Sequence, residues 1–145
     1  MNTIYQKILS IFFYTIPLKA AIPFGSYLFY KYSFLKIILY LTFPIALIEK
    51  SLPFGSLLLF LILFAGIVRN SNLPYFVRYN GCQALLLDIA LIIFSYILRI
   101  FPISEISLML FIVVLSIFTF STIQCIYGIE PEIPFISKST RMQIY

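Results

Sequence analysis

Long apolar runs, broken by a few polar residues, dominate the pattern along this chain. Runs such as 57–64 and 110–115 show no alternation of apolar and polar positions, so they predict helices rather than the strands of a membrane β-barrel. With 62% hydrophobic and 10% charged residues, the 145-residue chain has more apolar surface than a soluble domain of this size can bury. The sequence therefore predicts an all-α, polytopic membrane protein.

The apolar runs predict four transmembrane helices in a single membrane domain, residues 1–145. A helix needs about 20 apolar residues to cross a hydrocarbon core roughly 30 Å thick. The runs that meet or approach this length give spans at about 34–48, 52–68, 80–100 and 106–129. After the last span, the polar tail 130–145 is expected to return to water.

The N-terminal stretch differs from the four predicted spans. Residues 8–33 mix lysines with aromatic and aliphatic residues, and Pro17, Pro23 and Gly25 interrupt the pattern. Proline removes a backbone hydrogen bond inside a helix. This composition favours a segment that lies in the membrane interface over a further span.

Basic residues in the loops predict how the bundle is oriented. If the N-terminus faces the inside, that side receives eight of them: Lys7, Lys19, Lys31, Lys36, Arg69, Arg78, Lys138 and Arg141. The other side keeps two, Lys50 and Arg99. By the positive-inside rule, both termini are expected on the cytoplasm-equivalent side. The net charge of +5 follows from this topology and from anionic headgroups, so it calls for no nucleic acid partner.

The stretch 68–89 holds most of the candidate functional residues. It crosses a short basic loop with Arg69 and Arg78 and enters the span that begins near Asn80. Asn80 and Gln83 have the spacing of a helix N-cap and its reciprocal partner, although the helix could also begin earlier, at Pro74. These polar groups indicate either helix packing or a polar pathway.

Asp88 is the strongest polar signal, because it is expected about 12 Å inside its span. An ionised carboxylate there costs about 2.5 to 3.5 kcal/mol, so it should face protein or water. As a clamp between helices it would bond a hydroxyl of the last span, from Ser116, Thr119 or Ser121. As part of a pathway it would act through its charge. Both interpretations stay open at this point.

Most catalytic chemistry is excluded by composition. The chain contains no histidine, which excludes Ser-His triads, Cys-His pairs and most zinc sites. Cys82 and Cys125 form no C-x-x-C pair, and we expect no disulfide between them on a reducing side of the membrane. A single membrane carboxylate is a poor catalytic set. We expect neither an enzyme nor a cofactor or metal.

Three motifs stand out along the chain: V-R-N at 68–70 with P-Y-F-V-R-Y-N-G-C-Q-A-L-L-L-D-I at 74–89, I-P-F-G-S-Y-L-F at 22–29, and the Pro-rich ending Y-G-I-E-P-E-I-P-F-I-S-K-S-T-R-M-Q-I at 127–144. They resemble motifs of the Tic-twenty family, subunits of the protein translocon at the inner envelope of chloroplasts. Lys19 and Ala20 depart from the family, which often has an acidic residue and a glycine there.

The resemblance implies a four-helix subunit of the inner envelope membrane with stromal termini, which helps nuclear-encoded preproteins cross. The partners it implies are other translocon subunits or further copies of the chain, transient preproteins and membrane lipids. No transit peptide is visible, and the Ile-, Phe- and Tyr-rich composition suggests a plastid-encoded member. An assembly scaffold and a small solute or ion carrier are the alternative functions.

Overall fold

Every regular element in the residues that the computed structural model describes, 3–133 and 136–144, is a helix, which confirms the all-α prediction. Residues 1–2, 134–135 and 145 of the predicted domain lie outside the described residues. In chain order the elements are α1 (Ile4–Ala21), η1 (Ile22–Gly25), α2 (Ser26–Lys31), η2 (Ser33–Lys36), α3 (Ile37–Ser51), α4 (Ser56–Leu63), η3 (Phe64–Val68), α5 (Tyr75–Ile100), α6 (Ser104–Ile126) and α7 (Ile136–Gln143).

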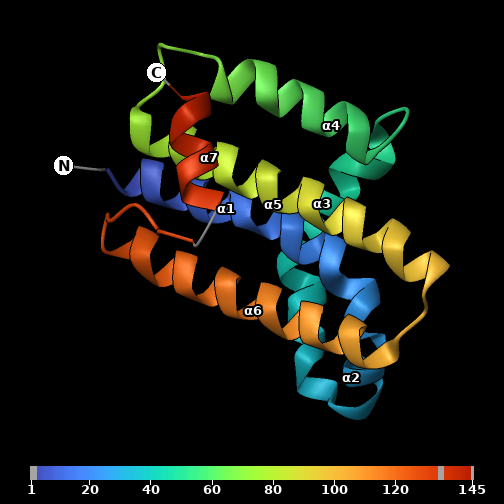
Figure 1. Cartoon of the computed structure of the whole chain (residues 1–145). Coiled ribbons are helices and arrows are strands. Elements are labelled where there is room, and N and C mark those ends of the chain that lie inside the picture. The colour runs from blue at the N-terminus through green and yellow to red at the C-terminus, as the bar shows by residue number, and fades with distance from the viewer. Residues whose placement is uncertain (1–2, 134–135, 145) are drawn as a thin grey trace.

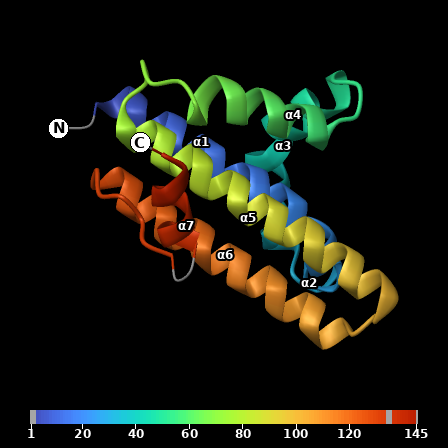
Figure 2. The ribbon, with the colours of Figure 1, turned by 45° about the horizontal axis from the view of Figure 1, so that its top comes forward.

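Three helical stretches are long and apolar enough to cross a membrane: Ile4–Lys31, Tyr75–Ile100 and Ser104–Ile126. They lie side by side, with α1 packed on both α5 and α6 (Figure 1). Helices α1 and α5 run in the same direction and α6 runs back, as a second view confirms (Figure 2). Both chain termini therefore lie at one end of the bundle, which we call the termini end; the other end is the opposite end.

The N-terminal stretch differs from the interfacial segment predicted at 8–33. Pro17 lies inside α1 without ending it, and its side chain is buried. Pro23 lies at the start of η1, where its missing N–H is no loss. Helices packed on both sides stabilise a proline-containing helix in a membrane, so prolines alone did not mark a break here.

Helices α3 and α4 occupy the places of the first two predicted spans, 34–48 and 52–68. Helix α3 has 15 residues, and the apolar part of α4 with η3 covers Leu57–Val68, so both are shorter than the three long stretches. Four transmembrane helices are therefore not confirmed. Helix α3 passes behind α1 and α5 at a steep angle, and α4 then returns beside α5 toward the termini end (Figure 1). The turn between them contains Phe54 and Gly55, both at positive φ.

The last two helices match the predicted spans more closely. Helix α5 begins at Tyr75, earlier than the predicted Asn80, and α6 ends at Ile126, near the predicted 129. The tail differs from the prediction for 130–145, because α7 packs against α5. Pro131, Ile133, Ser137 and Thr140 are buried there, so this tail is part of the fold.

The position of the candidate span Ile4–Lys31 redistributes the basic residues on which the predicted orientation was based. The termini end carries five of them: Lys7, Arg69, Arg78, Lys138 and Arg141. The opposite half carries four: Lys31, Lys36, Lys50 and Arg99. Five against four is a weak bias compared with the predicted eight against two, because Lys31 and Lys36 lie in the opposite half and Lys19 lies near the middle of Ile4–Lys31, where it counts for neither side.

Candidate functional site

The two arginines of the stretch 68–89, Arg69 and Arg78, lie near the end of η3 and make different contacts. Arg69 is exposed, and its guanidinium lies 5.2 Å from the centre of the Phe64 ring. Arg78 is only 8% exposed, and its Nε donates a hydrogen bond to the carbonyl oxygen of Val68 at 3.0 Å. Because Val68 is the last residue of η3, this bond ties the end of η3 to the first turns of α5.

Asn80 and Gln83 do not cap a helix, which corrects the predicted capping pair. The helix begins at Tyr75 after Pro74, the earlier start that the sequence left open. Both amides are fully buried inside α5. The Asn80 amide nitrogen donates to the carbonyl oxygen of Phe76, one turn back in its own helix, at 2.8 Å.

Five side chains form a buried network, which we call the amide–hydroxyl network: Tyr14, Tyr79, Asn80, Gln83 and Ser137. The Tyr14 hydroxyl donates to Oδ1 of Asn80 at 2.7 Å and accepts from Nε2 of Gln83 at 2.9 Å. The Ser137 hydroxyl donates to Oε1 of Gln83 at 2.7 Å. The Tyr79 hydroxyl lies 2.9 Å from Oγ of Ser137.

The network also holds the backbone of the tail. The carbonyl oxygen of Pro131 accepts from Tyr79 at 2.7 Å and from Gln83 at 3.0 Å, and the N–H of Ile133 donates to Ser137 at 2.7 Å. These bonds join α1, α5 and the chain from 131 to 137. Buried polar groups need such partners, so the network fixes how the three segments pack.

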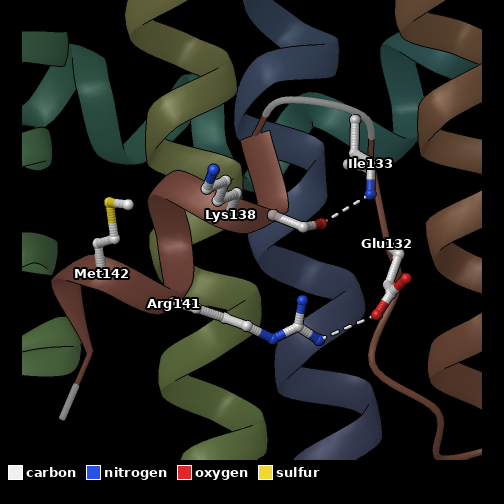
Figure 3. Close-up of a pocket in the computed structure, with 6 residues that line it drawn as sticks. Glu132, Ile133, Lys138, Arg141 and Met142 are labelled. Atoms are coloured by element: carbon white, nitrogen blue, oxygen red, sulfur yellow. Dashed lines mark hydrogen bonds and ion pairs between the residues drawn. The ribbon is translucent and has the colours of Figure 1, made fainter.

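A shallow cavity of about 610 Å³ lies over the same tail, at the termini end (Figure 3). Lys138, Arg141 and Met142 of α7 line it together with Glu132 and Ile133. Arg141 pairs with Glu132 at 3.2 Å and with Glu130 at 3.6 Å, and its guanidinium lies 5.2 Å from the centre of the Tyr79 ring. The acidic and basic groups here balance each other, so the cavity favours no anion.

A second polar group, which we call the charge cluster, consists of Lys19, Glu49 and Asp88. Lys19 of α1 forms an ion pair with Glu49, near the end of α3. Asp88 is 5% exposed and interacts electrostatically with both. Lys19 lies near the middle of Ile4–Lys31 and Asp88 near the middle of α5. Lys19 and Glu49 therefore pair between α1 and α3, and the buried carboxyl group of Asp88 on α5 lies within the electrostatic influence of both.

The hydroxyls expected to bond Asp88 from the last span make other contacts. Those of Ser116 and Thr119 donate to carbonyl oxygens one turn back in α6, at 2.8 and 2.9 Å. Ser121 lies beside Tyr14. The charges that act on Asp88 come instead from Lys19 of α1 and Glu49 of α3. The role of Asp88, as a clamp or as part of a pathway, stays a prediction.

An elongated cavity of about 510 Å³ lies between α4 and α5 on the opposite half of the bundle. Leu57 and Phe60 line its α4 side, and Ser95, Tyr96 and Arg99 line its α5 side. Ala20 and Ile89, direct neighbours of Lys19 and Asp88 in sequence, are also in its wall. The cavity thus extends from the end of α5 toward the charge cluster.

The described residues contain no group of three or more His, Cys, Asp or Glu side chains that could hold a metal ion. Cys82 and Cys125 are both buried and free. The Cys125 thiol lies 3.5 Å from Oδ1 of Asn80, so it borders the amide–hydroxyl network. The amide–hydroxyl network and the charge cluster can form hydrogen bonds and ion pairs, and these bonds position the helices that carry them.

Sequence reasoning missed Lys19, Glu49, Tyr14, Tyr79 and Ser137. Lys19 had a usable signal, since it is the only charge between Lys7 and Lys31 in a long apolar stretch. A lone charge in such a stretch indicates a buried partner. The tyrosines and Ser137 had none, because the partners that join them to other segments lie 52 or more residues away in the chain.

Comparison with known proteins identifies relatives along nearly the whole chain. The family model described as "Chloroplast import apparatus Tic20-like" matches residues 3–140. The "Tic20 family protein" of Synechocystis is 32% identical, over 96% of this chain and 92% of the relative. "Protein TIC 20-v, chloroplastic" of Arabidopsis thaliana is 29% identical, over 96% of this chain and 71% of the relative.

"Protein TIC 20-II, chloroplastic" of the same plant is 27% identical, over 66% of this chain and 46% of the relative. The match to the family model includes α1 to α6, the charge cluster and the amide–hydroxyl network as far as Ser137. The chain therefore belongs to the Tic20-like family.

Proposed function

We propose that this chain is a membrane subunit of the protein import machinery at the chloroplast inner envelope, where it helps preproteins cross. The observation that carries the proposal is the match of the Tic20-like family model to residues 3–140. Two relatives bear chloroplastic names, whereas the Synechocystis relative leaves a related role in a bacterial membrane possible.

The charge cluster supports a role beyond passive packing. Ionisable residues inside a membrane are costly, and they mark pathways or specific contacts between helices. We propose that Lys19, Glu49 and Asp88 form a polar clamp that holds α1, α3 and α5 together. Asn80, Gln83 and Arg78 hold the termini end, and Arg69 lies at its surface.

We propose four membrane crossings in one domain. Ile4–Lys31 makes the first crossing. Helix α4 with η3 makes the second, in place of the two spans predicted at 34–48 and 52–68. Helices α5 and α6 make the third and the fourth. Both termini then face the same side, and by analogy with the family this side is the stroma. The composition argument for a plastid-encoded chain belongs to the same proposal.

A bundle of this size is too small to enclose a polypeptide on its own. The proposed partners are therefore other translocon subunits or further copies of this chain, with lipids around them and a preprotein in transit. A scaffold that assembles such a complex without contacting the preprotein is the alternative within the same machinery.

Affinity purification from the native membrane, with a preprotein arrested during transit, tests the proposal. We expect tagged chain to recover the arrested preprotein together with further membrane subunits. An untagged strain and a tagged, unrelated membrane protein of similar size are the controls. Recovery of the subunits without the preprotein would favour the scaffold, and recovery of neither would favour a carrier.

A further inference from the structure

In the proposed arrangement of four crossings, one crossing is unusually short. Helix α2 ends near the opposite end, and α5 begins at the termini end (Figure 1). Only α3, α4 and η3 connect them, and α3 lies across the bundle rather than along it (Figure 2). The return along the bundle axis is therefore made by α4 and η3.

The apolar part of this return covers Leu57–Val68, 12 residues. At 1.5 Å per residue it is about 18 Å long, against about 39 Å for α5 and about 35 Å for α6. A hydrocarbon core is roughly 30 Å thick, so this side of the protein is about 12 Å too short for it.

Polar groups define both ends of the short helix. At its start, the turn 51–55 follows Glu49 and Lys50, and Lys50, Ser51 and Phe54 are exposed. At its end, Arg69 is exposed beside Asn70. Charges and turn backbone do not face lipid tails, because no partner replaces their water.

The start of α4 lies deep relative to α1. Leu59 packs in one buried cluster with Ile16 and Ile45, and Ile16 lies near the middle of Ile4–Lys31. Glu49, just before the turn, pairs with Lys19 at a similar depth. The turn at the start of α4 is therefore well inside the end of α1–α2, and Leu57 lies across a cavity from the last turns of α5.

We propose that the bilayer is locally thinned along α4, with lipid headgroups and water reaching the turn 51–55. The exposed apolar side chains of α4, Leu57, Leu61 and Ile62, match a thin hydrocarbon layer. Lys50, before α4, and Arg69, after η3, lie where they can pair with the phosphate groups on the two sides of this thin layer. A short hydrophobic stretch commonly thins the membrane around it. The inference rests on the four crossings proposed above but not on the proposed role in import, and a thinner bilayer would lower the barrier to a crossing polypeptide.

Thiol labelling of the purified chain in phosphatidylcholine vesicles tests this inference. Phe54→Cys places a thiol on the turn, and Val113→Cys places one on the exposed face of α6, nine residues from its start. Phe101→Cys marks the ordinary interface at the end of α5. The native Cys82 and Cys125 are buried and give the background. A charged maleimide is added on both sides of the membrane.

We expect Phe54→Cys to react at a rate close to that of Phe101→Cys and at least about tenfold faster than Val113→Cys, because a charged reagent does not enter hydrocarbon. In the same vesicles, a short bifunctional thiol reagent should link Ile16→Cys to Leu59→Cys, which fixes the depth of α4. Slow labelling of Phe54→Cys, whether lipid or a second copy covers it, would overturn the inference. Failure of the cross-link would overturn it too.

Discussion

Gln83 connects three segments of the chain through one side chain. Its amide nitrogen donates to Tyr14 of α1 and to the Pro131 carbonyl, and its amide oxygen accepts from Ser137 of α7. All three partners are buried with it, so none can turn to water instead. Residues of this kind stabilise mainly by preventing other buried groups from losing their partners.

Gln83→Leu keeps the approximate volume and removes all three bonds. We expect a loss of about 1 to 2 kcal/mol in the free energy of unfolding, because the Ser137 hydroxyl and the Pro131 carbonyl lose a partner in a buried site. Thermal unfolding in mild detergent measures it. Ser116→Ala is the control, since its hydroxyl bonds only its own helix and is exposed. Equal stability of the two variants would show that the network does not hold the tail.

The motif that contains Gln83 was recognisable from sequence, and its geometry was not. Charged and amide residues are rare in this chain, so Arg78, Asn80, Gln83 and Asp88 stood out against an apolar background. All four are buried. Sequence alone could not divide them between two polar groups, because that division depends on which helices pack on each face of α5.

At the scale of the elements, α1 is the helix whose role changed most. Pro17 and Lys19 suggested an interfacial segment, yet Phe13, Tyr14 and Leu18 are buried against neighbouring helices. Local rules describe an isolated helix, in which Pro17 would be costly. In the bundle, packing on two sides outweighs that loss, and Lys19 meets its counter-charges on α3 and α5.

We expect substitutions of the three residues in the charge cluster to change the free energy of unfolding by unequal amounts. Lys19→Met leaves two carboxylates without a cation, whereas Glu49→Gln leaves Asp88 to interact with Lys19. We expect Lys19→Met to lower the free energy of unfolding by about 1 to 3 kcal/mol, below the range for fully buried pairs because the Lys19 side chain is 35% exposed. Glu49→Gln and Asp88→Asn should each change it by less than half as much. Equal losses from Lys19→Met and Glu49→Gln in chemical denaturation would mean that Asp88 does not share Lys19.

Two glycines provide a matched test of helix packing. A Cβ atom added at Gly25 would lie 2.5 Å from the Phe111 ring of α6, whereas one at Gly66 would meet nothing within 4 Å. We expect Gly25→Ala to lower the free energy of unfolding by about 1 to 3 kcal/mol, because the added methyl group overpacks the contact with Phe111. Gly66→Ala should leave the free energy of unfolding unchanged or raise it by up to about 1 kcal/mol, because alanine lowers the conformational entropy of the unfolded chain. Thermal unfolding in detergent compares them, and a neutral Gly25→Ala would contradict the close approach of η1 to α6.

At the scale of the whole molecule, composition and periodicity were enough for the class and for part of the topology. The apolar runs gave helices, and the spans expected at 80–100 and 106–129 overlap α5 and α6. The first half was harder, because residues 34–68 are apolar enough to suggest two spans but are divided by a turn. The lengths of α3 and α4, and the angle between them, follow from contacts with α1 that no local pattern records.

These differences change how the chain is placed in a membrane. Both termini lie at one end of the bundle, but the charge bias that would orient this end in a membrane is weak (Figure 1). Orientation therefore has to come from experiment. Labelling Lys7→Cys and Lys138→Cys from each side of sealed native vesicles should give the same sidedness for both, and opposite sidedness would remove the four-crossing arrangement.

The most direct test of the central claim, that this Tic20-like chain serves in protein import, is import itself after the chain is depleted. Radiolabelled preprotein is added to organelles from depleted cells, and protease-protected mature protein is measured over time. We predict a lower import rate that the unchanged chain and Gly66→Ala restore, and that Lys19→Met restores less well. An unchanged import rate in organelles that lack the chain would contradict the account.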